Sequence, residues 1–217
     1  MKNAVRFFYI EVIRCRAQLW FFILFFAIAL YTGKNNPFFS VSYMCFCGVI
    51  MSVQPFQQEQ LAESGFLNML PGTKRERVCG RYLFGLGMIL VSALLGMLVL
   101  LLGSGMEHQK NANLLPVLVT CIGITLIVLS FQYVLFYAMG KIKSQQFAGL
   151  IMMAPGFIFF FGMNFLLGKM QKNNVDILYW WMKHMEPLAW CVLLLGILLW
   201  IGSMRCAVRL IQKRDFL

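Results

Sequence analysis

Six long apolar segments constrain this 217-residue sequence more than any other feature. A helix that crosses the hydrocarbon core of a bilayer needs about 20 predominantly apolar residues. None of the six segments contains Asp, Glu, His, Lys or Arg. They predict six membrane-spanning helices, at residues 17–33, 38–54, 82–103, 114–139, 147–168 and 187–204.

The composition supports the same interpretation. Hydrophobic residues make up 60% of the chain and charged residues 12%, whereas soluble domains have about 45–50% and about 25%. The net charge of +11 is a feature of many nucleic-acid-binding proteins, but a chain this apolar has too little water-facing surface to bind DNA or RNA. We therefore expect an all-α integral membrane protein with one transmembrane domain over residues 1–217 and no nucleic-acid partner. Membrane lipid is an expected partner instead.

The distribution of basic residues predicts the orientation. With the N-terminus inside, 14 of the 19 Lys and Arg residues lie in inner segments and 5 in outer loops. Cytoplasmic loops carry an excess of Lys and Arg, so both termini are expected in the cytoplasm of a multi-pass plasma-membrane protein. A cleavable signal peptide is the alternative for the first span, because Ala27-Ile28-Ala29 fits a cleavage pattern. However, the apolar run continues through Tyr31.

Residues 1–16 predict an amphipathic helix at the inner surface of the membrane. One face, with i, i+3, i+4 spacing, carries Val5, Phe8, Tyr9, Val12 and Ile13. Such a helix places its apolar face at the acyl boundary and its Arg residues at the phosphates. The alternative is a helix that simply extends the first span into the cytosol.

The inner loop at 55–81 contains a helix-start pattern. Pro71 and Gly72 interrupt the chain, Thr73 follows as a candidate N-cap, and Glu76 lies three residues further on. This spacing is that of the reciprocal capping box. It predicts that the third spanning helix begins directly after Thr73.

The charges of this loop are arranged in an acidic and then a basic block. Glu59 and Glu63 come first, and Lys74, Arg75 and Arg77 crowd the predicted first turn, where the helix macrodipole disfavours cations. Lipid phosphates, the two glutamates or an acidic partner would offset that cost. The positive-inside requirement alone also accounts for the cations, though not for the order of the two blocks.

Two further segments are candidates for movement. Residues 176–186 predict a short helix on the outer surface, with one stripe formed by Ile177, Leu178, Trp181, Met182 and Met185. In the fifth predicted span, Pro155-Gly156 would kink or loosen the helix near its middle.

No catalytic or metal-binding motif is present in the sequence. It contains no GxxxxGK[ST], HExxH or GxSxG pattern, and the seven cysteines have no zinc-binding spacing. We expect the thiols to be free and to pack as small hydrophobic groups. The chain itself is therefore not expected to be an enzyme or to hold a metal or cofactor.

The segment LPGTKRERVCGRYL at residues 70–83 resembles the "Leu-Pro-x-Ser/Thr-Arg-Lys-x-x-Val-x-x-Lys-Tyr" segment of ABC-2 type permeases, the membrane subunits of bacterial ATP-binding-cassette exporters. Glu59 matches an acidic position in the same loop, and the basic tail at 208–216 is similar to the family's ending. The sequence departs from the pattern at Gly72 and Gly80, and it has Arg81 where Lys is usual.

The resemblance implies a type V exporter-like fold. Its amphipathic start would be a connecting helix, and the loop between spans two and three would be a coupling helix that docks on an ATPase. The segment before the sixth span would gate the exit. It also implies two separate P-loop ATPase subunits that bind ATP and Mg, and a second permease copy or paralogue. Similar small Gram-positive permeases export phenol-soluble modulins or give immunity to antimicrobial peptides.

These features predict the permease subunit of an ATP-driven exporter of amphipathic or hydrophobic peptides. Glu59, Glu63, Pro71, Thr73, Lys74, Arg75 and Arg77 are the expected docking residues. One alternative is an ATP-independent membrane scaffold or immunity protein that binds a peptide or lipid. Another is a membrane-embedded enzyme whose site the motifs do not show.

Overall fold

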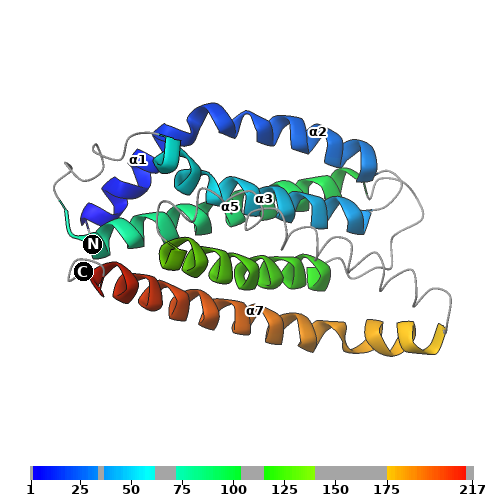
Figure 1. The fold of residues 1–217 in the computed structure, drawn as a ribbon. Helices are drawn as coiled ribbons and strands as arrows, with labels where there is room; N and C mark the ends of the chain where they lie inside the picture. Colours follow the sequence, from blue (N-terminus) through cyan, green and yellow to red (C-terminus); the bar gives the residue numbers. More distant parts are fainter. Residues whose placement is uncertain (1, 34–36, 62–71, 104–114, 140–174, 214–217) are drawn as a thin grey trace.

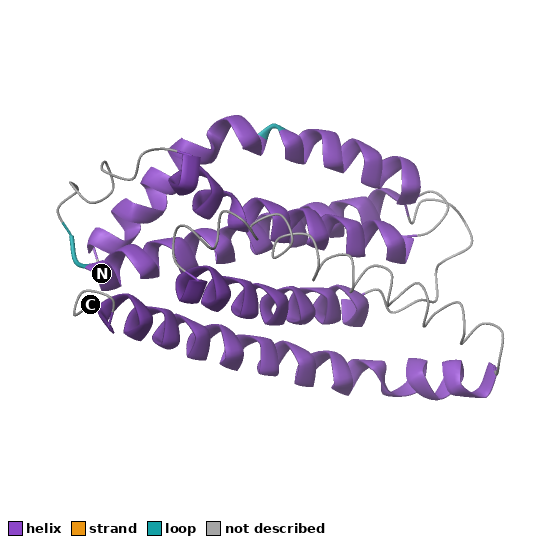
Figure 2. Ribbon diagram, viewed as in Figure 1, coloured by secondary structure: helices purple, strands orange, loops and turns teal. Residues whose placement is uncertain are grey.

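The computed structural model describes residues 2–33, 37–61, 72–103, 115–139 and 175–213, and within these ranges the chain is helical apart from short turns (Figures 1 and 2). The fifth predicted span, with Pro155 and Gly156, lies outside the described residues. The helices run roughly alongside one another as a bundle (Figure 1). The expectation of an all-α fold is therefore confirmed for the described part of the chain.

Two helices joined by a bend form the start of the chain. Helix α1 covers Lys2–Leu19 and helix α2 covers Phe21–Gly33, with an angle of 55° between them at Trp20. The two helices together are long and apolar enough for one bent span, so both predicted interpretations of this segment stay open. Helix α1 is a separate element that approaches the bundle at an angle.

The exposed face of α1 agrees only partly with the predicted stripe. Val5, Tyr9 and Ile13 are exposed, as an interfacial helix requires, while Phe8 and Val12 are half-buried. The buried face is a different one, formed by Ala4, Phe7, Glu11 and Cys15. Contact of the exposed face with lipid stays a prediction.

The centre of the bundle consists of α3 (Pro37–Leu61) and α5 (Lys74–Gly103). Helix α3 runs on through Pro55 to Leu61, whereas the sequence predicted that the second span ends at residue 54. Its apolar part is Ser40–Phe56. Helix α5 begins directly after Thr73, as the capping pattern predicted.

The far side of the bundle is formed by the helix Leu115–Met139 and by α7 (Val175–Lys213). Helix α7 is one continuous element with Pro187 inside it. The prediction of a separate surface helix at 176–186 is therefore wrong, because this segment and the predicted sixth span belong to the same helix. A local apolar pattern does not distinguish a new helix from the first turns of a longer one.

Three helices among the described residues are long and apolar enough to cross a membrane: Lys74–Val99, Leu115–Met139 and Glu186–Gln212. The bent pair α1 and α2 adds a fourth when it is counted as one span. These helices agree with predicted spans three, four and six. The start of α1, the start of α5 and the end of α7 lie at the same end of the bundle (Figure 1).

The core has two main parts, with α3 and α5 contributing to both. One part packs α1 and α2 against α3 and α5 through Phe22, Met44, Met51, Phe84 and Met88. The other packs α3 and α5 against the helix Leu115–Met139 and α7, and six of its thirteen buried residues are aromatic. The central pair of helices therefore connects the two sides of the bundle.

Close backbone contact joins the helix Leu115–Met139 to α7. A Cβ added at Gly123 would lie 2.8 Å from the Leu193 nitrogen, and one added at Gly196 would lie 2.7 Å from the Gly123 carbonyl oxygen. Small residues allow helices in a membrane to approach this closely. All seven cysteines are free, as the sequence predicted.

Candidate functional site

The first turn of α5 is fixed by a hydrogen-bonded cap. The backbone N–H of Thr73 donates to Glu76 Oε2 at 3.0 Å, and the N–H of Glu76 donates to Thr73 Oγ1 at 3.3 Å. This reciprocal pair is the predicted capping box. The Asn3 amide of α1 donates to the same Glu76 oxygen at 3.2 Å. The cap of α5 is thus also a contact with α1.

These hydrogen bonds change the acidity of Glu76, which is half-buried and lies in the polar turn ahead of the apolar part of α5. The Thr73 N–H, and after it the Asn3 amide, hold the pKa of this carboxyl below its ordinary value. Hydrogen bonds to a carboxylate favour its charged form. Glu76 therefore stays ionised at neutral pH and offsets part of the positive charge around it.

A ring of α1 fills the space beside two glycines. A Cβ at Gly80 would lie 2.5 Å from the Phe7 Cβ and 3.1 Å from the Ala4 carbonyl oxygen, and a Cβ at Gly72 would lie 2.6 Å from the Phe7 ring. Arg77 lies over the same ring, 5.9 Å from its centroid, within the range of a cation–π contact. The two departures from the permease pattern, Gly72 and Gly80, are therefore the positions that accept Phe7.

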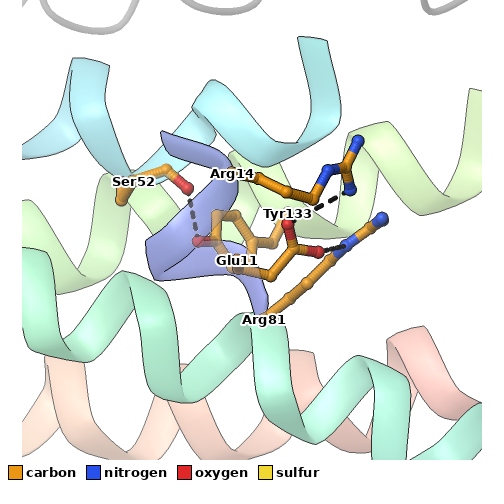
Figure 3. Close-up of polar contacts among 5 residues, drawn as sticks. All are labelled: Glu11, Arg14, Ser52, Arg81 and Tyr133. Carbon is orange, nitrogen blue, oxygen red and sulfur yellow. Dashed lines mark hydrogen bonds and ion pairs between the residues drawn. The ribbon is translucent and has the colours of Figure 1, made fainter. Parts of the chain in front are cut away.

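A buried ion pair joins α1 to α5 one turn further along. Arg81 Nε donates to Glu11 Oε1 at 3.2 Å, and Arg14 lies 3.4 Å from the other Glu11 oxygen. The side chains of Arg81 and Glu11 are only 5% and 3% exposed. In Figure 3 the Glu11 carboxylate lies between the two guanidinium groups. Removal of one partner from such a pair is costly because a buried charge is left behind.

Arg81 also connects this pair to the aromatic part of the core. Its guanidinium lies 4.9 Å from the ring centroid of Phe56 on α3. Phe56 in turn stacks on Phe136 at 4.9 Å and meets the edge of Tyr133 at 5.0 Å. Tyr82, the residue after Arg81, packs on Trp200 of α7 at 4.7 Å. Two neighbouring residues of α5, Arg81 and Tyr82, therefore contact α1, α3 and α7.

The structure places some of the predicted docking residues and not others. Lys74 and Arg75 are exposed on the first turn of α5, and Arg77 is half-buried. Glu59 lies in the last turn of α3, but its side chain is outside the described set, and Glu63 and Pro71 lie outside the described residues. The predicted gating residues belong to α7, with side chains outside the described set.

The sequence pattern gave Glu11 and Arg81 no role in this site beyond their charge. One sequence feature identifies Glu11 in retrospect. It lies four positions from Phe7 and four from Cys15, so it is an acid on an otherwise apolar face of the helix. In the described part of the chain, no three His, Cys, Asp or Glu side chains are grouped to hold a metal ion.

The model of the ABC-2 family transporter proteins matches residues 8–212 of this chain. The match covers most of the chain, and this chain belongs to the ABC-2 family of transporter proteins. Members of this family are membrane components of ABC transporters and generally act with an ATPase subunit. Comparison with curated proteins and with solved structures found no match to this chain.

Proposed function

We propose that this protein is the permease subunit of an ATP-driven exporter, and that its cargo is an amphipathic or hydrophobic peptide. In this proposal the six predicted spans cross the plasma membrane of a Gram-positive bacterium with both termini in the cytoplasm. Two P-loop ATPase subunits bind ATP and Mg beneath a pair of permeases. The second permease is another copy of this chain or a paralogue.

The observation that carries the proposal is the way α1 holds the start of α5. The exposed cations Lys74 and Arg75 lie on a turn that Glu76 caps and that Phe7 and Glu11 attach to α1. Cations in the first turn of a helix are unfavourable for its macrodipole, so an acidic surface that covers them would stabilise the turn. The ATPase is the proposed source of that surface.

The common end of α1, α5 and α7 supports the orientation. The start of α5 and the end of α7 carry exposed basic side chains, among them Arg75, Arg205 and Arg209, and both lie at the end where α1 begins (Figure 1). Basic residues concentrate on the cytoplasmic side. A partner in the cytoplasm would therefore meet the α1–α5 junction and the adjoining loop.

The cargo class follows from the apolar character of the spans. Several buried polar side chains of the described spans bond to the backbone of their own helix, among them Ser92, Thr125 and Ser130. Ion-coupled carriers need ionisable groups inside the membrane, and the six predicted spans contain none. An apolar or amphipathic cargo is compatible with a transport pathway lined by such spans.

The test is affinity purification of the tagged protein from its native membrane after mild crosslinking. We expect a P-loop ATPase at about one copy per permease. The double variant Lys74→Glu/Arg75→Glu should lose the ATPase, while the matched double variant Arg205→Glu/Arg209→Glu, at the exposed end of α7, should keep it. Recovery of the wild-type permease alone would contradict the proposal and favour an ATP-independent scaffold or immunity protein.

A further inference from the structure

Helix α3 contains a proline at the level of the α1–α5 junction. Pro55 is fully buried and lies inside the helix, which continues to Leu61. Proline has no N–H, so the carbonyl of Met51 has no helical donor at position 55, and the ring crowds that carbonyl. Sharp changes of helix direction occur at such prolines, and the last turns of α3 run at an angle to the rest of it (Figure 1).

The part of α3 before Pro55 is held by Tyr133. The Tyr133 hydroxyl donates to the Ser52 carbonyl oxygen at 2.7 Å (Figure 3). Both residues are fully buried, and the Ser52 hydroxyl donates back to Val49 at 2.8 Å. This bond attaches the turn before the proline to the helix Leu115–Met139.

The part of α3 after Pro55 is held by Arg81. Phe56, the next residue, lies 4.9 Å from the Arg81 guanidinium, which Glu11 fixes from α1. Residues 62–71 join the end of α3 to the cap of α5. A displacement of the end of α3 and a displacement of the start of α5 would therefore both act on the contact between Phe56 and Arg81.

We propose that Pro55 is a hinge of α3, and that Arg81 and Tyr133 are positioning residues that hold its two sides. The proposal rests on the proposed function and adds the element through which the ATPase moves the spans. When the ATPase displaces the end of α3, that end turns at Pro55 and carries Phe56 across Phe136 and Tyr133. Through the ion pair of Glu11 and Arg81, α1 and α5 move together with the end of α3.

The first variant is Pro55→Ala, which restores the missing N–H and stiffens the helix. The complex with its ATPase is reconstituted, and a fluorescent 20-residue Leu/Lys amphipathic peptide serves as the transport probe. We expect Pro55→Ala to have a melting temperature at least as high as wild type, to bind the ATPase and to hydrolyse ATP within twofold. Peptide transported per ATP should fall at least tenfold. If Pro55 only stabilised the fold, the melting temperature, ATP hydrolysis and peptide transport would change together.

The matched control is Pro187→Ala, which removes the exposed proline inside α7. It should leave the amount of peptide transported per ATP unchanged. The second variant, Glu11→Leu/Arg81→Met, keeps the volume of the buried pair without its charges and should also lower the ratio. The hinge would be overturned if Pro55→Ala, or the folded Glu11→Leu/Arg81→Met variant, transported as much peptide per ATP as wild type. Loss of ATPase binding in both variants would also overturn it. Absence of transport by the wild-type complex would instead count against the proposed function.

Discussion

Phe7 of α1 lies against Gly80 of α5 so closely that a Cβ at position 80 would come within 2.5 Å of the Phe7 Cβ. The contact lies between the capping box of α5 and the buried pair of Glu11 and Arg81. It means that α1 cannot move away from the start of α5 without loss of a packed ring, a buried ion pair and the hydrogen bond from Asn3.

Gly80→Ala should destabilise the protein although alanine favours helices. The gain in helix propensity is about 0.5–1 kcal/mol, but overpacking against Phe7 and the Ala4 carbonyl oxygen costs about 1–3 kcal/mol. Gly202→Ala in α7 is the control, because nothing lies within 4 Å of its added Cβ. Thermal unfolding in detergent should show a lower midpoint for Gly80→Ala and an equal or higher one for Gly202→Ala. The opposite order would show that α1 does not pack as described.

Thr73→Ala should loosen the start of α5. Loss of an N-cap costs about 1 kcal/mol, and amide exchange of residues 74–77 should become faster. Thr73→Ser keeps the hydroxyl and should behave as wild type.

The cap should also respond to acid. Because the pKa of Glu76 is lowered in the folded protein, its contribution is present above the ordinary carboxyl pKa and is lost as the pH falls through the lowered value. Glu76→Gln should remove this pH dependence. Unchanged amide exchange in Thr73→Ala at neutral pH would mean that the capping box does not hold the turn.

Glu11→Ala should be among the most damaging single changes in the chain. It leaves the Arg81 charge buried beside Phe56, and removal of one partner of a buried pair costs about 3–5 kcal/mol. Glu11→Leu/Arg81→Met should recover most of that loss, because the charge and its partner leave together. Unfolding of Glu11→Leu, of Arg81→Met and of the double variant forms the cycle that measures the coupling. Additive losses would contradict the ion pair.

Gly123→Ala should separate two helices. Its Cβ would meet the backbone of α7 at Leu193 and Val192, at 2.8 and 2.9 Å, and backbone atoms cannot rotate aside. Gly96→Ala on α5 meets its nearest neighbour at 3.8 Å and serves as the control. We expect a lower unfolding temperature for Gly123→Ala alone. Equal unfolding temperatures for the two variants would exclude the close approach of the helix Leu115–Met139 to α7.

Local patterns in the sequence predicted the local features of the structure. The box of Thr73 and Glu76 involves residues three positions apart, and spans three, four and six depend on runs of apolar residues. Such features need no knowledge of the tertiary fold. The start of α5 was therefore placed correctly from the sequence alone.

Features that depend on distant residues were not predicted. Glu11 and Arg81 are 70 positions apart, so no local pattern shows that they pair. The second span was predicted to end at residue 54, but α3 continues through Pro55, and Phe56 beyond it packs on Arg81 and Phe136. The same limitation applies to α7, where a surface helix at 176–186 and a separate span from residue 187 were predicted but one helix contains both segments.

The most direct test of the account is peptide uptake into inside-out membrane vesicles that contain this permease and its ATPase. With the labelled Leu/Lys peptide outside, ATP and Mg should drive accumulation inside the vesicles, and vanadate should abolish it. Vesicles with Lys74→Glu/Arg75→Glu should accumulate no more peptide than vesicles without ATP. Equal uptake with and without ATP in wild-type vesicles would contradict the claim that this chain is the permease of an ATP-driven peptide exporter.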